Sequence, residues 1–198
     1  RDAFLGRKAP DLDFTTSALP DETIAILKGK VDAHWDIGRE FGTIGARIGD
    51  DTIEITTYRA DKYDRDSRKP EVAFGKDLTA DLFRRDFTVN ALYYDPYDET
   101  IHDYHHGYAD LKQRTLRMIG DPQVRYREDP VRMLRAVRLG AKLGLNLDPA
   151  TRRPIREMAD LLDNVPPARL FDEMLKLLTC GDALACLKRL RAEGLHHG

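Results

Sequence analysis

Short runs in which apolar and polar residues alternate mark the first half of the chain, and residues 52–58 form the clearest of them. Ile53 and Ile55 share one face of this run when it is extended, whereas Glu54 lies on the other face. The alternation predicts a β-strand. Together with the residues before it, this strand is expected to form a hairpin or meander over residues 31–58.

A strand and a helix are predicted ahead of this hairpin. Pro10 disfavours a helix at its position, and the aromatic and threonine residues that follow favour an extended chain, so we expect a strand over residues 11–16. Residues 17–28 begin with helix start signals and continue with apolar residues, which predicts a helix. Residues 1–9 are typical of the end of a helix, with Gly6 as its stop.

The middle of the chain alternates between charged and structured segments. Residues 59–79 are rich in charged side chains, and we expect them to form a mobile loop. A helix is predicted over residues 79–92. A hairpin signal follows over residues 93–103, where Asp and Pro occur together, and residues 103–111 are expected to form a turn that leads into a helix.

Strand signals fade from about residue 115, and the rest of the chain is predicted to be helical. One helix is expected to begin near Asp129, which would act as its N-cap, with Pro130 at the first helical position. Its apolar stripe would consist of Met133, Leu134, Val137, Ala141 and Leu145. An adjoining sector would present Arg132, Arg135, Arg138 and Lys142. Guanidinium groups in such a row suit phosphate oxygens, although the same pattern also fits a capped helix with a solvated basic face.

Composition restricts the class of protein. The chain has 198 residues, of which 41% are hydrophobic and 33% charged, so it can form one large domain or two small ones. We see no apolar run of membrane-spanning length and no secretory signal. Cys180 and Cys186 lack the spacing of a metal site, and two cysteines are too few for a disulfide framework. Free thiols in a cytosolic protein fit this pattern best.

The distribution of charge is more informative than its sum. The net charge is −2, but residues 112–158 contain 12 Lys or Arg and 5 Asp or Glu, an excess of +7, so the remainder carries −9. An acidic part followed by a basic part suggests a cation-binding site beside an anion-binding surface. An ordinary solvated helix face is the simpler explanation of the basic part.

Paired carboxylates form the first candidate site. In a strand, Asp11 and Asp13 project from the same face and repel each other unless a cation lies between them. Hard oxygen ligands at this spacing suit Mg²⁺. If the strand over residues 52–58 neighbours this one, Glu54 becomes a third carboxylate at the same cation. Solvated aspartates in a turn and a solvent-facing strand residue are the alternatives.

A second candidate is the octapeptide at residues 84–91, with the sequence RRDFTVNA. Two arginines beside an aspartate are poor core material, because buried charges are costly unless they pair with each other or with a ligand. A surface ion pair at a helix start is the alternative.

These segments together resemble the class II template-independent RNA nucleotidyltransferases, the family of CCA-adding tRNA nucleotidyltransferases and bacterial poly(A) polymerases. Six segments carry the resemblance in the order of the family's motifs. They are the glycine-rich signature at residues 1–6, the metal-binding pair at 11–13, the strand of the third carboxylate at 53–59, the ribose-recognition motif at 84–91, the flexible spring at 103–111 and the nucleotide-selecting motif at 128–138. The resemblance extends over essentially the whole chain.

The two halves resemble different branches of this family. Residues 34–92 are more similar to a CCA-adding enzyme. Residues 93–198 are more similar to a poly(A) polymerase, above all at residues 125–129 and 166–173. The choice between CCA addition and poly(A) addition therefore stays open at the level of the sequence.

The resemblance implies an α+β fold with three parts. Residues 1–114 would form a nucleotidyltransferase head with a mixed, polymerase-β-like sheet, and the family's first strand and glycine turn are expected before Arg1. Residues 115–160 would form a helical, nucleotide-selecting neck, and residues 161–198 the start of a helical body. We expect a monomer.

The resemblance also implies an activity, namely template-independent addition of nucleotides to RNA 3′ ends, in tRNA or mRNA, from ATP or from CTP and ATP. Asp11 and Asp13, supported by Glu54, would hold two Mg²⁺ ions, one at the attacking 3′-hydroxyl and one at the leaving pyrophosphate. A non-catalytic RNA-binding remnant and a metal-dependent phosphohydrolase are the alternatives.

Eight further residues are implied to bind the nucleotide. Arg1 and Arg85 would contact it, and Asp86 and Asn90 would order the ribose pocket. The remaining four would read the base edge or contact the phosphates. Asp129 and Arg132 are assigned to the base edge, because together they offer acceptors and donors, and Arg135 and Arg138 to the phosphates.

Overall fold

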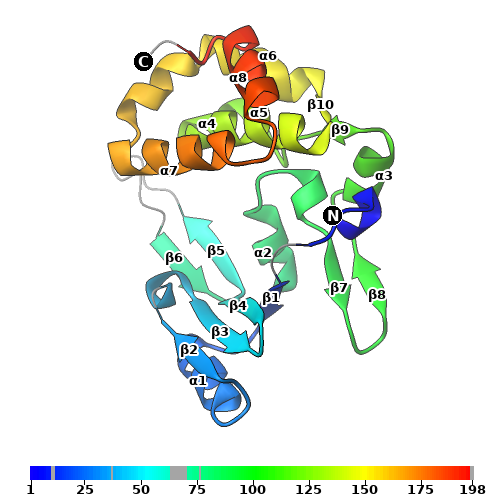
Figure 1. Cartoon of the computed structure of the whole chain (residues 1–198), viewed down its shortest axis with the longest axis vertical. Helices are drawn as coiled ribbons and strands as arrows, with labels where there is room; N and C mark the ends of the chain where they lie inside the picture. The colour runs from blue at the N-terminus through cyan, green and yellow to red at the C-terminus, as the bar shows by residue number, and fades with distance from the viewer. Residues whose placement is uncertain (10–11, 37, 63–70, 76, 197–198) are drawn as a thin grey trace. The chain divides into compact units, whose positions relative to one another are not determined.

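The computed structural model describes residues 1–9, 12–36, 38–62, 71–75 and 77–196. The chain divides into two compact units, one formed by Asp2–Arg84 and the other by Arg1 together with Arg85–Gly198. Figure 1 labels the elements of both. No helix in the described part of the chain is long and apolar enough to cross a membrane.

The unit formed by Asp2–Arg84 is built on a four-stranded mixed sheet with the strand order β1-β4-β3-β2. Its strands are β1 (Leu12–Thr16), β2 (Ala33–Trp35), β3 (Thr43–Ile48) and β4 (Asp51–Thr57). β1 runs parallel to β4, and the other pairs are antiparallel. The 3₁₀ turn η1 (Ala3–Leu5) precedes β1, the helix α1 (Pro20–Leu27) lies between β1 and β2 in sequence, and the 3₁₀ turn η2 (Arg39–Phe41) lies between β2 and β3. The predicted strands, hairpin and helix of residues 11–58 are therefore present, with shorter bounds.

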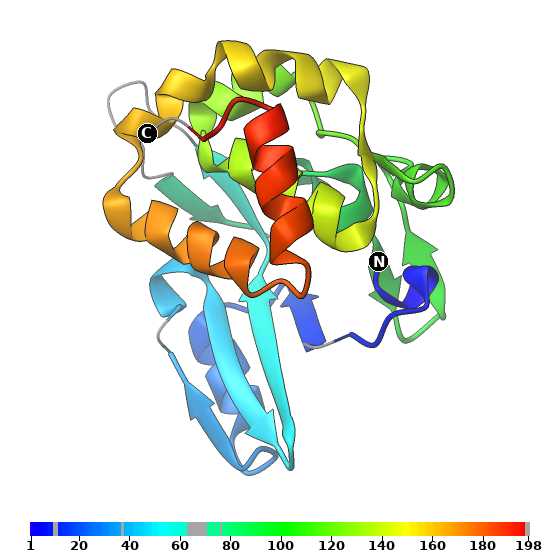
Figure 2. The same cartoon turned by 45° about the horizontal axis from the view of Figure 1, so that its top comes forward.

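One face of this sheet packs against α1. Leu27 of α1 forms a buried cluster with Ile44, Ala46 and Ile53 of β3 and β4, and Figures 1 and 2 both show α1 lying along these two strands. Because side chains alternate along a strand, the neighbours of these core residues, such as Glu54, project from the opposite face. The sheet thus has a core face and a second face that carries polar residues.

The expectation of a loop over residues 59–79 is wrong at both ends. β5 (Arg59–Lys62) and β6 (Glu71–Phe74) pair in antiparallel fashion, and α2 (Leu78–Phe83) follows. A two-stranded ribbon forms through backbone hydrogen bonds and does not require an apolar face. The charged sequence of residues 59–79 therefore lacks the alternation that would have predicted these strands. Residues 63–70 lie outside the described residues.

The second unit opens with short elements. They are η3 (Thr88–Asn90), the hairpin strands β7 (Tyr93–Asp95) and β8 (Thr100–His102), α3 (Gly107–Lys112) and β9 (Thr115–Leu116). The hairpin and the turn into α3 match the prediction. The helix predicted over residues 79–92 does not, because α2 ends at Phe83 and the following octapeptide contains only the short 3₁₀ turn η3.

Helices form the rest of this unit. They are α4 (Pro122–Glu128), α5 (Val131–Leu143), α6 (Pro149–Glu157), α7 (Pro167–Leu178) and α8 (Ala183–Ala192), with the 3₁₀ segment η4 (Ala159–Asn164). β10 (Asn146–Leu147) pairs with β9, a short parallel ladder that the sequence did not indicate. α5 is buried on almost all sides and packs against α4, α7 and α8 (Figure 2). The fold class is α+β, as predicted, whereas the proposed division at residues 114 and 160 stays a prediction.

Candidate active site

The predicted carboxylates are brought together where β1 pairs with β4. Asp13 lies directly opposite Glu54 in the parallel register, and neighbouring residues in register share a face of the sheet. That face is the one opposite to the α1 core, and both residues are exposed. The condition under which Glu54 would join the aspartates, adjacency of the two strands, is therefore met. Asp11 lies outside the described residues.

The chemistry of these two side chains suits Mg²⁺. Magnesium is usually held by one or two protein carboxylates together with waters and substrate phosphates, so Asp13 and Glu54 supply an adequate protein share. Within the described residues, no group of three or more His, Cys, Asp or Glu side chains is placed to hold a metal ion. The described part of this side of the sheet therefore offers two carboxylates, Asp13 and Glu54, and we call it the carboxylate face.

Four of the predicted nucleotide-binding residues are linked in the second unit by a chain of hydrogen bonds. Arg1 donates from Nη1 to Asn90 Oδ1 over 2.6 Å, and Asn90 donates from Nδ2 to Asp86 Oδ1 over 3.0 Å. Arg135 of α5 donates from Nε to the other oxygen of Asp86 over 2.7 Å. Asn90 and Arg135 therefore both contact the Asp86 carboxylate, and Arg1 is connected to it through Asn90. We call Arg1, Asp86, Asn90 and Arg135 the polar cluster.

The ionisation of the polar cluster is set by burial and by its internal partners. Burial alone would raise the pKa of Asp86, but the charge of Arg135 and the hydrogen bonds from Asn90, Arg135 and the Phe87 amide outweigh it and lower that pKa. Burial likewise opposes the charged form of Arg135, yet Asp86 raises the pKa of Arg135 above its ordinary value. Both side chains are consequently held ionised.

Arg85 of the octapeptide makes an aromatic contact. Its guanidinium lies over the ring of Tyr93, 5.3 Å from the ring centroid, in a cation–π contact. Its backbone carbonyl accepts a hydrogen bond of 2.6 Å from Arg125 Nη2 of α4. The structure thus places Arg85 beside the hairpin strand β7, and its predicted contact with a nucleotide stays a prediction.

The octapeptide of residues 84–91 is held by pairing with the chain around Met118. Phe87 and Met118 form an isolated antiparallel bridge, the Thr88 amide donates to the Arg117 carbonyl, and the Ile119 amide donates to the Asp86 carbonyl. These bonds satisfy the backbone around Phe87, which is extended, and this explains why the helix α2 does not continue through the octapeptide. Asp86 is fixed in place as a result.

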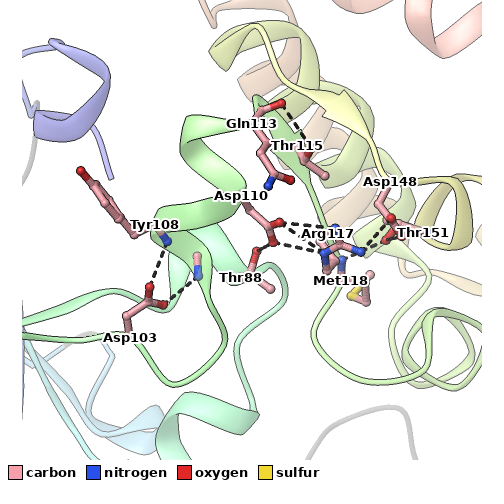
Figure 3. A network of polar contacts seen from close by, with 11 residues as sticks. Thr88, Asp103, Tyr108, Asp110, Gln113, Thr115, Arg117, Met118, Asp148 and Thr151 are labelled. Atoms are coloured by element: carbon pink, nitrogen blue, oxygen red, sulfur yellow. Dashed lines mark hydrogen bonds and ion pairs between the residues drawn. The ribbon is translucent and has the colours of Figure 1, made fainter.

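A network of side chains holds this segment in place, as Figure 3 shows. Thr88 donates from Oγ1 to Asp110 Oδ2 over 2.6 Å, and Arg117 Nε lies 3.2 Å from the same oxygen. Arg117 also donates from Nη1 to Asp148 Oδ1 over 2.8 Å. Asp110 and Thr88 are buried. The network links the octapeptide to α3 and to the start of α6, and we call Thr88, Asp110, Arg117 and Asp148 the supporting network.

The expected exposed row of arginines on α5 is wrong. Arg132 is buried and donates from Nη1 to the Arg125 carbonyl over 2.9 Å, and Arg138 is buried and donates from Nε to Glu173 Oε1 of α7 over 2.6 Å. The reason is that α5 is packed on almost every side, so its polar positions must find partners within the protein. Arg135 is the only partly exposed arginine of the three, and its guanidinium forms an ion pair with Asp86.

Asp129 does not act as the side-chain N-cap of α5. It is the C-cap residue of α4, and α5 has Pro130 at its N-cap position with no side-chain cap bond. The side chain of Asp129 instead accepts from Arg169 Nη2 of α7 at Oδ2, over 3.0 Å. Its other oxygen, Oδ1, is buried and has no hydrogen-bond partner among the described residues. A buried carboxylate oxygen without a partner is costly and indicates a role beyond capping.

Sequence reasoning missed several residues that shape this site. Asp110 lies in the spring segment, and Arg125, Arg169 and Glu173 lie in segments that carried the family resemblance, but none was selected. Their roles depend on partners 7 to 40 positions away, such as Arg117 for Asp110 and Asp129 for Arg169. The segments that resemble the family indicated which parts of the chain contribute to the site. They did not indicate which side chains pair with one another.

Comparison with known families decides the relationship. The poly(A) polymerase head domain family matches residues 1–117, which is more than half of the chain. The chain belongs to this family. Residues 144–198 also match a family described as a probable RNA- and SrmB-binding site of polymerase A. The predicted relationship to the class II template-independent nucleotidyltransferases is confirmed.

Two curated relatives illustrate both branches of the family. Poly(A) polymerase I of Haemophilus influenzae is 44% identical over 206 residues, covering 98% of this chain and 45% of the relative. The CCA-adding enzyme of Bacillus velezensis is 38% identical over 196 residues, covering 98% of this chain and 48% of the relative. The chain thus spans about half the length of these relatives.

Solved structures share the fold over almost the whole chain. The CCA-adding enzyme of Bacillus stearothermophilus, solved in complex with CTP, has a TM-score of 0.85 and 37% identity, covering 98% of this chain and 46% of that one. A tRNA nucleotidyltransferase complexed with a primer tRNA and an incoming ATP analogue has a TM-score of 0.80 and 30% identity, covering 98% of this chain and 55% of that one. The α+β assignment rests on the same likeness.

Proposed function

We propose that this protein adds nucleotides to RNA 3′ ends without a template, as a poly(A) polymerase or CCA-adding enzyme. The observation that carries the proposal is the polar cluster, in which four predicted nucleotide-binding residues from three segments are connected by hydrogen bonds. The family match and the likeness to structures that hold CTP or an ATP analogue support it. We also expect a monomer that works in the cytoplasm.

The carboxylate face would bind the catalytic metal. Asp13 and Glu54, joined by Asp11, would hold two Mg²⁺ ions between the protein and the triphosphate. When bound, magnesium neutralises charge on the phosphates and lowers the pKa of a coordinated hydroxyl. The contribution of the protein is a set of carboxylates fixed on paired strands, so that little reorganisation is needed when substrate arrives.

The polar cluster would order the ribose and phosphates of the incoming nucleotide. Asp86 and Asn90 are held by Arg135 and by the octapeptide backbone, so their remaining hydrogen-bonding groups have fixed directions. Arg1 and Arg135 bring two cations to the same place, which suits an anionic ligand. Arg85 and Arg138 are proposed as further contacts to the nucleotide and its phosphates, and both would have to exchange part of their present contacts for the ligand.

Base recognition would fall to Asp129 and Arg132. The unpartnered Oδ1 of Asp129 is an acceptor, and the Arg132 guanidinium supplies donors, so together they can match the pairing edge of a base. Arg169 holds the other oxygen of Asp129 and thereby limits the rotation of the carboxylate. Which base this edge prefers decides between adenylate addition and CCA addition.

A primer-extension assay tests the proposal. The protein is incubated with Mg²⁺, an RNA primer and labelled ATP or CTP in separate reactions. Lengthening of the primer is the expected result, and lengthening with ATP alone or with both nucleotides identifies the reaction. Release of phosphate without lengthening would indicate a phosphohydrolase, and RNA binding with neither reaction would indicate a non-catalytic remnant.

A further inference from the structure

Trp35 lies in the same row of the sheet as the carboxylates. Trp35 of β2 is directly opposite Gly45 of β3, Gly45 is opposite Glu54 of β4, and Glu54 is opposite Asp13 of β1. Residues in register share a face, so all four project from the face that α1 does not cover. An aromatic ring therefore stands on the carboxylate face of the sheet.

The indole lies across the backbone of Gly45. A Cβ atom added at Gly45 would stand 2.1 Å from Nε1 and 2.2 Å from Cε2 of Trp35, so only glycine leaves room for the ring. Gly45 is buried, whereas Trp35 is 36% exposed. One side of the ring thus packs on the strand and leans towards Glu54, and part of the ring remains open to solvent.

Core packing does not explain this arrangement. The buried cluster of this unit consists of Leu27, Ile44, Ala46 and Ile53 on the other face, and Trp35 is not part of it. A partly exposed ring beside polar carboxylates adds little to the core. A flat aromatic surface that is supported from one side is, by contrast, the form of a stacking platform for nucleic-acid bases.

The same face carries a positive charge suited to a phosphate. Arg47 follows Gly45 by two residues on β3, so it projects from the same face, and it is exposed. Its guanidinium forms no ion pair with any described residue. Base stacking on an aromatic ring next to an arginine that contacts the backbone is a common way to hold single-stranded RNA.

We propose that Trp35 stacks against the base at the 3′ end of the RNA primer, with Arg47 at an adjoining phosphate. The inference rests on the proposed function, which places the primer 3′-hydroxyl at the carboxylates. Neighbouring strands are about 4.8 Å apart, so a ring leaning across β3 lies within roughly one strand spacing of Glu54. The residues assigned to the base and ribose of the incoming nucleotide, such as Asp129 and Asp86, belong to the other unit, so we assign this aromatic surface to a base of the primer.

Fluorescence provides a direct test, because Trp35 is the only tryptophan in the chain. Titration with a short oligoribonucleotide, with Ca²⁺ in place of Mg²⁺ and without nucleotide, should quench its emission to saturation. Trp35→Ala should weaken primer binding, measured by anisotropy of a labelled RNA, by roughly tenfold, and Trp35→Phe should retain most of the affinity. Phe41→Ala removes another exposed aromatic from the same unit and should leave binding unchanged.

Two further variants separate stacking from a purely structural role. Gly45→Ala keeps Trp35 but displaces the ring, so it should shift the emission and weaken primer binding. Arg47→Gln should lower the slope of log affinity against log salt by about one, while leaving the quenching intact. In extension assays, Trp35→Ala should raise KM for the primer and leave KM for the nucleotide unchanged.

Several outcomes would overturn the inference. Equal primer affinity in Trp35→Ala and the unaltered protein would exclude a stacking role, and quenching by ATP or CTP alone would assign the platform to the incoming nucleotide. Primer extension that is indifferent to Trp35 would refute the inference and leave the proposed function standing. Quenching by RNA without any extension would refute the proposed function and leave the RNA platform.

Discussion

Arg135 Nη2 lies 2.6 Å from Asp86 Oδ2, so α5 and the central octapeptide share an ion pair although 49 positions separate the two residues. The Asp86 side chain is almost entirely buried, and that of Arg135 is one-third exposed. This pair anchors the polar cluster. The geometry of the polar cluster therefore depends on the ion pair that fixes the Asp86 side chain to Arg135.

Removing the charge of Asp86 should destabilise the protein. Asp86→Asn leaves Arg135 without its counter-ion in a largely buried place, and we expect a loss of roughly 3 kcal/mol in the free energy of unfolding. Arg135→Met should cost a similar amount, and the double variant less than the sum, with a coupling of roughly 2 kcal/mol. Urea unfolding of the four proteins measures the cycle. Strict additivity of the two substitutions would show that the pair contributes no coupling.

The pH dependence of this difference follows from the direction of the pKa shift. The folded pKa of Asp86 lies below its ordinary value of 3.8, so the stabilisation is fully present above that value and is lost as pH falls through the folded pKa. The stability difference between the unaltered protein and Asp86→Asn should hold constant from about pH 7 to pH 5 and shrink only below about pH 4. A difference that already declines near neutral pH would contradict the lowered pKa.

Gly107 should not tolerate a side chain. An added Cβ would stand 2.2 Å from the carbonyl oxygen of Thr88, which belongs to the octapeptide backbone and cannot move without disturbing the supporting network. We expect Gly107→Ala to lower stability by roughly 2 kcal/mol. Gly75→Ala is the control, since its Cβ would approach only the Asp77 amide at 3.9 Å, and it should change stability by less than about 0.5 kcal/mol. Thermal unfolding followed by circular dichroism compares the two.

The two thiols should differ in reactivity. Burial, with the neighbouring Cys180 thiol as the second cause, raises the pKa of Cys186 to about 12, whereas Cys180 is partly exposed and its sulfur lies 3.1 Å from that of Cys186. The thiolate is the reactive form, so at about pH 8 a maleimide should modify one thiol quickly and the second only after unfolding. Mass spectrometry should locate the fast label on Cys180. Fast labelling of a Cys180→Ser variant would contradict the burial of Cys186.

The strands of the four-stranded sheet, the β7–β8 hairpin and the helix α1 could be predicted because they follow from local patterns. The alternation around Ile53 and the turn residues of the β7–β8 hairpin each specify an element without reference to distant residues. The joint role predicted for Asp13 and Glu54 depended on the pairing of their two strands. These strands do pair, and Asp13 lies in register with Glu54. A small sheet allows few arrangements of neighbouring strands, so the pairing of these two strands could be expected from the sequence.

The partners of charged side chains could not be predicted. The helical periodicity places Arg132 and Arg138 on one sector of a helix, and a row of charged residues of this kind usually indicates a solvent-exposed face. The helix instead lies at the centre of its unit. Arg132 therefore donates a hydrogen bond to a backbone carbonyl of α4, and Arg138 donates one to a carboxylate of α7. Likewise, Asp129 fits the pattern of an N-cap, but Arg169 offers a stronger, charged partner. Tertiary contacts decided these cases, and no local pattern encodes them.

The most direct test of the central claim is primer extension by variants of the carboxylate face. Asp13→Asn and Glu54→Gln remove one negative charge each and keep the shape of the side chain, and Asp51→Asn does the same at an exposed aspartate of β4 outside the site. With Mg²⁺, RNA primer and ATP or CTP, we predict a loss of about a hundredfold or more in extension rate for Asp13→Asn and a large loss for Glu54→Gln, with RNA binding intact and Asp51→Asn unaffected. Extension at the unaltered rate by Asp13→Asn and Glu54→Gln would contradict the assignment of this face as the catalytic centre.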